Sequence, residues 1–470
     1  MTDRIPRSVV FGAMVFAPMF LAYIAYSRPW YFTSQTYLGG LILLEFVIAA
    51  VWMYRRVFFP VLIMVFLLAG VNLPVGTVWT AARWLFLAIG AVFGLFITMR
   101  EHRFHFGLFH LIAGFSILTA LLSATVSRYP SVALLKILSL FLLFLYAATG
   151  ARVAVTGREN SFFARLLLGC EVFVAVNAIF YSVGIEMMGN PNSLGAVMGV
   201  VGAPLLLWGT LVAEQRSVRH RRGALFAIAM CLGFVSHSRA GLAAAVVSCG
   251  LLCLALRKYK MFIEGMVVLT IVLAATGIFR PEFLTSTTSS VLYKGADEQR
   301  GILASRQSPW HAAMDNIREH PWFGTGLGTT ADGGDPAGEH ASFSSTAAVT
   351  AEHGSSYLSI TVGVGTIGLL PFASLLLILA GRIFHTVSWM CQHRLATHPA
   401  VPLATVMLAG IIHAAFEDWM FAAGNYLCVF FWVIAFVFID ASSFVKVHDF
   451  ALSWRRHSGT AVSAAVRSNF

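Results

Sequence analysis

The stretch SYLSITVGVGTIGLLPFASLLLILA, residues 356–380, contains no charged side chain. About 20 predominantly apolar residues are enough for a helix to cross the hydrocarbon core of a bilayer. The stretch follows the one long polar interruption of the chain, residues 280–355, which ends in Glu352-His353-Gly354-Ser355. We therefore expect water-soluble chemistry in this interruption and at the helix ends beside it.

The composition of the whole chain indicates a membrane protein. Of its 470 residues 58% are hydrophobic and 11% are charged, whereas a soluble domain has about 25% charged residues. Apolar segments recur along the chain, among them residues 9–26, 37–54, 108–126 and 261–279, and predict about 12 to 14 transmembrane helices. The first begins near Val9, and we interpret it as a span because many similar segments follow it. The predicted fold is an all-α polytopic membrane protein with one large extracytoplasmic loop.

Positive charge predicts the orientation of the spans, because cytoplasmic loops collect Lys and Arg. With the N-terminus inside, the outer turns hold only a few arginines: Arg28, Arg83, Arg128 and Arg239. Both termini are then cytoplasmic, and the 280–355 loop faces outward. The net charge of +11 is explained by cytoplasmic turns beside anionic lipid, with no need for nucleic acid.

The chain divides into five predicted regions. They are N-terminal transmembrane helices (1–190), core transmembrane helices (191–279), an outer catalytic loop (280–355), C-terminal transmembrane helices (356–445) and a cytoplasmic tail (446–470). The outer loop has five basic and nine acidic residues, so an anionic substrate would need specifically placed arginines. Its glycine run 324–328 imitates a dinucleotide fingerprint but follows no strand, so we expect it to turn the chain sharply.

Two arginines are candidates for anion binding. Arg239 lies in a tight outer turn between two apolar spans, where a cation is a functional candidate, although it could simply anchor the helix end. Arg306 precedes a short amphipathic helix predicted to start at Ser308-Pro309 and to end at Pro321. The free N–H groups at a helix start favour an anion. The alternative for Arg306 is a solvated surface charge.

His353 is the candidate base, because imidazole titrates near neutrality and can accept a proton from a hydroxyl group. The alternative is an interfacial histidine that satisfies the start of the next helix. A zinc site with Glu339, His340 and Glu352 is conceivable, but no metal-ligand spacing supports it. We therefore predict no metal and no cofactor.

These motifs together resemble the bacterial O-antigen ligase and polymerase family. They are Ser-Arg-Ala-Gly at 238–241, Arg306 four residues before Trp310, His-Pro-Trp-Phe-Gly at 320–324, and His353 followed by Tyr357. The resemblance is best from Asn-Pro-Asn at 190–192 to about residue 435, including Phe-Glu-Asp-Trp at 416–419. One departure is Gly354, because members commonly have Asn directly after the histidine.

The resemblance implies a metal-independent, inverting glycosyltransferase with a GT-C-like fold. Its donor would be a glycan linked to undecaprenyl diphosphate, used at the periplasmic face of the bacterial inner membrane. Arg239 and Arg306, with Arg300 as a secondary candidate, would bind the diphosphate, and His353 would be the general base. Four further residues would support the site: Tyr357, Trp310, Asn192 and Glu417.

The family divides by acceptor. A ligase transfers the glycan to lipid A core, a polymerase joins lipid-linked repeat units of O-antigen or exopolysaccharide, and a related branch modifies protein. We favour a ligase-like function for this chain, with a polymerase as the alternative. A transporter or flippase of lipid-linked sugars would instead have paired half-repeats and buried charges. Lys136, Glu171 and Glu45 are the few charges within predicted spans, and they form no symmetric set.

Overall fold

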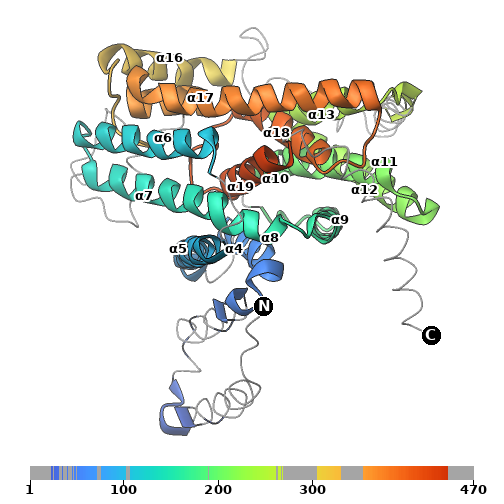
Figure 1. Ribbon diagram of the computed structural model, residues 1–470, viewed down its shortest axis with the longest axis horizontal. Coiled ribbons are helices and arrows are strands. Elements are labelled where there is room, and N and C mark those ends of the chain that lie inside the picture. Colours follow the sequence, from blue (N-terminus) through green and yellow to red (C-terminus); the bar gives the residue numbers. More distant parts are fainter. Residues whose placement is uncertain are drawn as a thin grey trace.

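A computed structural model describes residues 50–70, 76–101, 106–188, 190–260, 304–329 and 353–442, with isolated residues between 19 and 48 and between 263 and 267. Within these ranges every element is a helix (Figure 1). The α-helices are α4 (Phe59–Ala69), α5 (Gly76–Glu101), α6 (Leu108–Thr125), α7 (Pro130–Tyr146), α8 (Arg152–Val155), α9 (Glu159–Ser182), α10 (Pro191–Val197), α11 (Ala203–Val212), α12 (Arg216–Val235), α13 (Arg239–Ala255), α16 (Ala304–Glu319), α17 (Ser356–His393), α18 (Ala400–Ala414) and α19 (Tyr426–Ala441). Three π-helical segments adjoin them: η1 (Tyr54–Phe58), η2 (Ala147–Ala151) and η3 (Met198–Gly202).

The described helices confirm the all-α polytopic membrane fold. Six of them are long and apolar enough to cross a bilayer: Ala81–Glu101, Leu108–Thr125, Pro130–Val155, Glu159–Ser182, Pro191–Val212 and Ser356–His393. Three shorter apolar helices accompany them: Arg239–Ala255, Ala400–Ala414 and Tyr426–Ala441. Several predictions lie outside the described residues, namely most of the first two spans, the span at 261–279, much of the outer loop and the cytoplasmic tail.

Helix α19 is the centre of the packing. Every residue from Tyr426 to Phe438 is buried, as expected for a helix that is apolar on all sides. Its aromatic rings contact neighbouring helices, with ring centroids 4.9 Å apart for Trp432 and Phe144 of α7, and 5.0 Å apart for Phe436 and Phe109 of α6. Helices α6, α7 and α17 run side by side in Figure 1. Large rings thus fill the space that surrounding helices leave around α19.

Helix α17 is broken at Gly365, where φ is +67° and ψ is −177°. The segment 321–329 packs against this break, and its backbone forms hydrogen bonds with helix residues that have no partner within the broken helix. Thr366 N donates to Pro321 O at 2.8 Å, and Thr325 N donates to Val362 O at 2.9 Å. The glycine run turns as predicted, since Gly324, Gly326 and Gly328 have positive φ values of 70°, 104° and 67°.

Gly365→Ala is expected to destabilise the protein by more than about 2 kcal/mol. A positive φ with ψ near 180° is open essentially to glycine alone and costs another residue about 1–3 kcal/mol. The added Cβ would also collide with the backbone of Trp322. Thermal unfolding in detergent measures the effect. Gly381→Ala in the same helix is the control, because a Cβ there meets nothing within 4 Å. Equal melting temperatures for both variants would contradict the close approach.

The amphipathic helix differs from its predicted limits. It begins at Ala304, so Ser308 does not start it and Pro309 lies inside it. Arg306 therefore belongs to the first turn of α16 and does not precede the helix. Pro309 is the sixth residue of the helix, so its missing N–H removes the hydrogen bond that would otherwise join it to the Ser305 carbonyl. The predicted end is correct to within two residues, since α16 stops at Glu319 and Pro321 follows.

Candidate functional site

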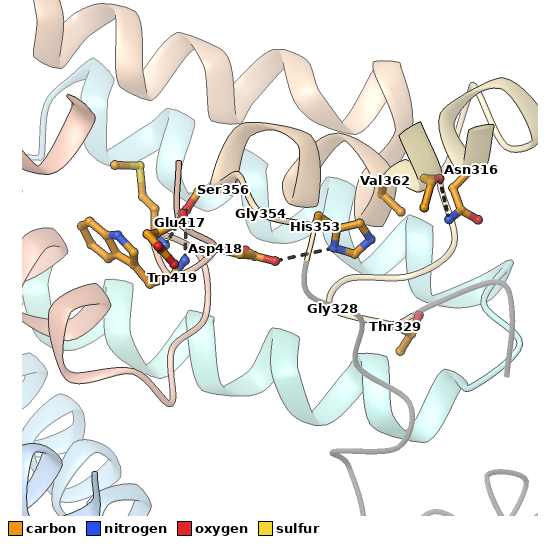
Figure 2. A network of polar contacts seen from close by, with 12 residues as sticks. Asn316, Gly328, Thr329, His353, Gly354, Ser356, Val362, Glu417, Asp418 and Trp419 are labelled. Atoms are coloured by element: carbon orange, nitrogen blue, oxygen red, sulfur yellow. Dashed lines mark hydrogen bonds and ion pairs between the residues drawn. The ribbon is translucent and has the colours of Figure 1, made fainter. Parts of the chain in front are cut away.

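His353 is a buried histidine immediately before α17. Only 5% of its surface is exposed, and neither ring nitrogen has a hydrogen-bond partner within the described part of the chain. Its Nδ1 lies 3.5 Å from Oδ2 of Asp418, in the loop between α18 and α19, as Figure 2 shows. The two groups make no hydrogen bond at this distance, and the carboxylate would attract the ring if the ring were protonated. Nε2, the other ring nitrogen, is buried as well.

Arg306 is the cation next to this histidine. Its guanidinium pairs with the carboxylate of Glu417, and both side chains are mostly buried. A Cβ on Gly354 would lie 3.3 Å from Cδ and 3.4 Å from Nη1 of Arg306, so the arginine passes against the residue that follows His353. Gly354 has φ +64°, and its carbonyl accepts a 3.3 Å hydrogen bond from the Trp310 indole. Helix α16 is thereby attached to the start of α17.

The loop that supplies both carboxylates is held by Ser356, the first residue of α17. The Ser356 hydroxyl donates to the Glu417 carbonyl at 2.7 Å and accepts from the backbone N–H groups of Trp419 and Met420, each at 3.0 Å. A hydroxyl group has one hydrogen to donate and two lone pairs that accept, so these three hydrogen bonds use all the bonding capacity of Ser356. The Trp419 indole also donates to His413 Nδ1 at 2.7 Å. Glu417 and Asp418 therefore project from a rigid backbone (Figure 2).

Arg239 joins the cluster from α13. It interacts electrostatically with both Arg306 and Glu417, repelled by the first and attracted by the second. Ser238 caps this helix, accepting from Gly241 N at 3.3 Å. Helices α10 and α13 touch through their backbones here, since a Cβ on Gly241 would collide with the carbonyl of Gly195. The turn before α13 is thus fixed in place by close backbone packing.

The glycine run ends at Gly328, which Figure 2 labels together with Thr329. Lys136 of α7 donates to the Gly328 carbonyl, and the Ser127 hydroxyl lies 3.2 Å from that of Thr329. The carboxylate of Asp418 attracts the Lys136 ammonium. Helices α6 and α7, from the N-terminal third of the chain, therefore contact the same site as α13, α16 and α17.

Residues 224–373 match the family model described as O-Antigen ligase. They form an O-antigen ligase family domain. The match includes Arg239, Arg306 and His353, whereas the carboxylate loop at 417–418 lies beyond it. A comparison with curated proteins gives no match.

The structure brings together most of the residues predicted for the O-antigen ligase site. Arg239, Arg306, His353 and Glu417 form one cluster, and Trp310 contacts its backbone. The other predicted residues are Tyr357, Asn192 and Arg300. The Tyr357 hydroxyl donates to Ile411 O at 2.7 Å in a contact between helices. Asn192 lies in the first turn of α10, and Arg300 lies outside the described residues.

The sequence analysis did not assign three residues that the structure places at or beside this cluster: Asp418, Ser356 and Lys136. Asp418 belongs to the motif Phe-Glu-Asp-Trp at 416–419, but only Glu417 of that motif was predicted to support the site. Lys136 was noted as a charge inside a span, which is itself a functional signal. Glu171, noted in the same way, has a different explanation, because it pairs with Arg221 and Arg222 at 2.8 Å each.

The cluster has the parts needed for transfer to a hydroxyl group. Two guanidinium groups can bind phosphate oxygens, and a buried imidazole with an adjacent carboxylate can accept a proton. Among the described residues no group of three His, Cys, Asp or Glu side chains could hold a metal ion. The residues of the zinc alternative other than His353 lie outside the described ranges.

Proposed function

We propose that this protein is a membrane glycosyltransferase of the ligase type. It transfers a glycan from undecaprenyl diphosphate to an acceptor hydroxyl at the outer face of the bacterial inner membrane. The proposal rests on one observation: Arg306 and His353, from separate segments, face the two adjacent carboxylates of one loop. Arg239 adds a second positive charge that interacts electrostatically with Glu417. The match of residues 224–373 to the O-antigen ligase family gives the substrate class in general terms.

Arg306 and Arg239 are suited to the leaving group. A diphosphate has several anionic oxygens, and guanidinium groups bind such oxygens through paired, planar hydrogen bonds. In the free protein Glu417 balances part of this positive charge. The two guanidinium groups therefore keep their positions while no anion is bound. As the bond from the sugar C1 to the phosphate oxygen breaks, its electron pair stays on the diphosphate, and the guanidinium groups stabilise that charge.

His353 is suited to activate the acceptor. Its Nε2 accepts the hydroxyl proton while the acceptor oxygen forms a new bond to C1, opposite the departing diphosphate. This direct displacement inverts the anomeric carbon. Asp418 faces Nδ1 and stabilises the imidazolium that results. No nucleotide is consumed, because the donor diphosphate linkage already supplies the leaving group.

The test is reconstitution of the purified protein in vesicles with an undecaprenyl-diphosphate-linked glycan and candidate acceptors. We expect release of undecaprenyl diphosphate together with a glycosylated acceptor. Glycan on lipid A core supports the ligase, whereas longer lipid-linked chains would indicate the polymerase. Movement of an unchanged donor across the vesicle membrane, with no diphosphate released, would contradict the glycosyltransferase and support a transporter.

Asp418→Asn is expected to lower the transfer rate about 10- to 100-fold, with little change in donor KM. The amide keeps the shape of the side chain but loses the negative charge that would stabilise a positive imidazole, and a 10- to 100-fold loss corresponds to about 1.4–2.7 kcal/mol. Steady-state kinetics measure the change. Asp315→Asn is the control, because Asp315 pairs only with exposed Arg318 on α16. Equal activity in both variants would remove Asp418 from the mechanism.

A further inference from the structure

His413 is a buried histidine near the end of α18 that the proposed reaction does not use. Only 1% of its surface is exposed. Its Nδ1 accepts a 2.7 Å hydrogen bond from the Trp419 indole, a group that can only donate. The imidazole is therefore neutral, with its proton on Nε2, and Nε2 has no hydrogen-bond partner among the described residues. Within that part of the chain, the bond to Trp419 is the one polar contact of the ring.

His413 also closes the loop that carries both carboxylates. Its backbone carbonyl accepts from Phe416 N at 3.1 Å, and its ring accepts from Trp419. Glu417 and Asp418 lie between these two residues in the sequence. The residues on both sides of the Glu-Asp pair are therefore hydrogen-bonded to the same histidine, once through its backbone and once through its side chain.

The packing around the Trp419 indole is otherwise apolar. The ring meets Phe431 of α19 edge-on, with centroids 5.7 Å apart and an angle of 77° between the planes. On α18 it lies beside Gly410, where a Cβ would be 3.6 Å from the indole Cη2. Hydrophobic burial has no preferred direction, whereas a hydrogen bond does. The imidazole thus orients a side chain whose own backbone N–H is bound to Ser356.

We propose that His413 is a positioning residue: its bond to Trp419 holds the loop between α18 and α19 in the position where the two carboxylates serve the reaction. The inference rests on the proposed function, since it assigns a role in support of that site. One carboxylate contacts Arg306, and the adjacent one lies 3.5 Å from His353 Nδ1. A shift of the loop backbone would alter both contacts, and a displacement of about 1 Å can cost on the order of 10²-fold in rate.

A double-mutant cycle on kcat tests this role, measured in the reconstituted protein below the melting temperature of every variant. His413→Leu and Trp419→Phe each remove one side of the hydrogen bond, and each is expected to lower kcat about 10-fold. The double variant is expected to lose little more than either single one, since residues acting as a unit are not additive. Single losses that multiply in the double variant would overturn the proposal, as would an unaltered kcat in either folded single variant.

His413→Asn tests whether the acceptor atom is what matters. The amide oxygen of asparagine can accept a hydrogen bond from the indole, so this variant should recover most of the kcat that His413→Leu loses. Equal losses in the two variants would overturn the role of the hydrogen bond. If His413→Leu does not fold, the Asn variant and Trp419→Phe decide the question, and an unaltered kcat in folded Trp419→Phe overturns the proposal.

Trp208→Phe is the control that separates positioning from stability. Trp208 is also a buried tryptophan, and its indole donates to Ala396 O at 2.7 Å, before the other end of α18. Its loss should lower the melting temperature much as Trp419→Phe does but leave kcat unaltered. An equal loss of kcat in both variants would overturn the positioning role.

The two levels of the argument fail in different ways. If the unsubstituted protein releases no undecaprenyl diphosphate, the proposed function is overturned, and the positioning role with it. Normal release by that protein, together with normal kcat in the folded His413 and Trp419 variants, would overturn the positioning role alone.

Discussion

His353→Ala is expected to reduce glycan transfer by about 10²- to 10⁴-fold, the range that general-base catalysis contributes. The imidazole is buried beside Asp418, and its ring nitrogens have no hydrogen-bond partner among the described residues. Little of the surrounding packing therefore depends on those nitrogens, and the variant should remain folded. Initial rates of undecaprenyl diphosphate release measure the loss, while donor binding should be nearly unchanged because both arginines are intact.

His311→Ala is the matched control for this prediction. His311 lies on α16 and is exposed, so its removal should leave transfer unaltered. A folded His353→Ala protein with normal transfer would remove the histidine as the base. Lost donor binding in that variant would likewise contradict the division of roles between the histidine and the arginines.

Arg306→Lys is expected to lose most of the activity although the positive charge is kept. A lysine has one compact ammonium group, so it cannot bind two phosphate oxygens side by side or keep the Glu417 contact in the same geometry. Charge-assisted hydrogen bonds contribute roughly 1.5–3 kcal/mol each, which corresponds to a loss of about 10- to 100-fold. The loss should appear in donor KM as well as in kcat, because the diphosphate is bound in both states.

Arg318→Lys on the same helix is the control for Arg306→Lys. Arg318 is 74% exposed and pairs with Asp315 one turn away, so the substitution should be silent. Full activity of the Arg306→Lys protein would show that only a positive charge is needed at this position. The donor would then be bound without paired guanidinium contacts.

The membrane fold could be predicted largely from the sequence because apolar length determines it. The span predicted at 108–126 agrees with Leu108–Thr125, and the turn before Arg239 lies where the charge pattern indicated. The start of α16 was wrong because Ser308-Pro309 is a good helix start in isolation, and the preceding Ala304 and its neighbours extend the helix. The break at Gly365 was not predicted, because it depends on docking of the distant 321–329 segment.

The site could be predicted only in part, since its residues are far apart in sequence. Arg239, Arg306 and His353 were found because a cation or a histidine at a span end is unusual in an apolar chain. Asp418 and Ser356 have no such signal, as their roles depend on the loop conformation. Tyr357 was assigned to the site through the family resemblance, but α17 directs its hydroxyl to α18.

The two carboxylates of the site belong to consecutive residues, Glu417 and Asp418, on a loop whose backbone is held by Ser356. Adjacent Cα atoms are separated by a fixed distance of about 3.8 Å. In the proposed reaction this fixed spacing sets the separation between Arg306, the cation that receives the leaving group, and His353, the base that receives the proton. The site would then accept only a molecule whose hydroxyl reaches the sugar carbon from the His353 side, opposite the diphosphate.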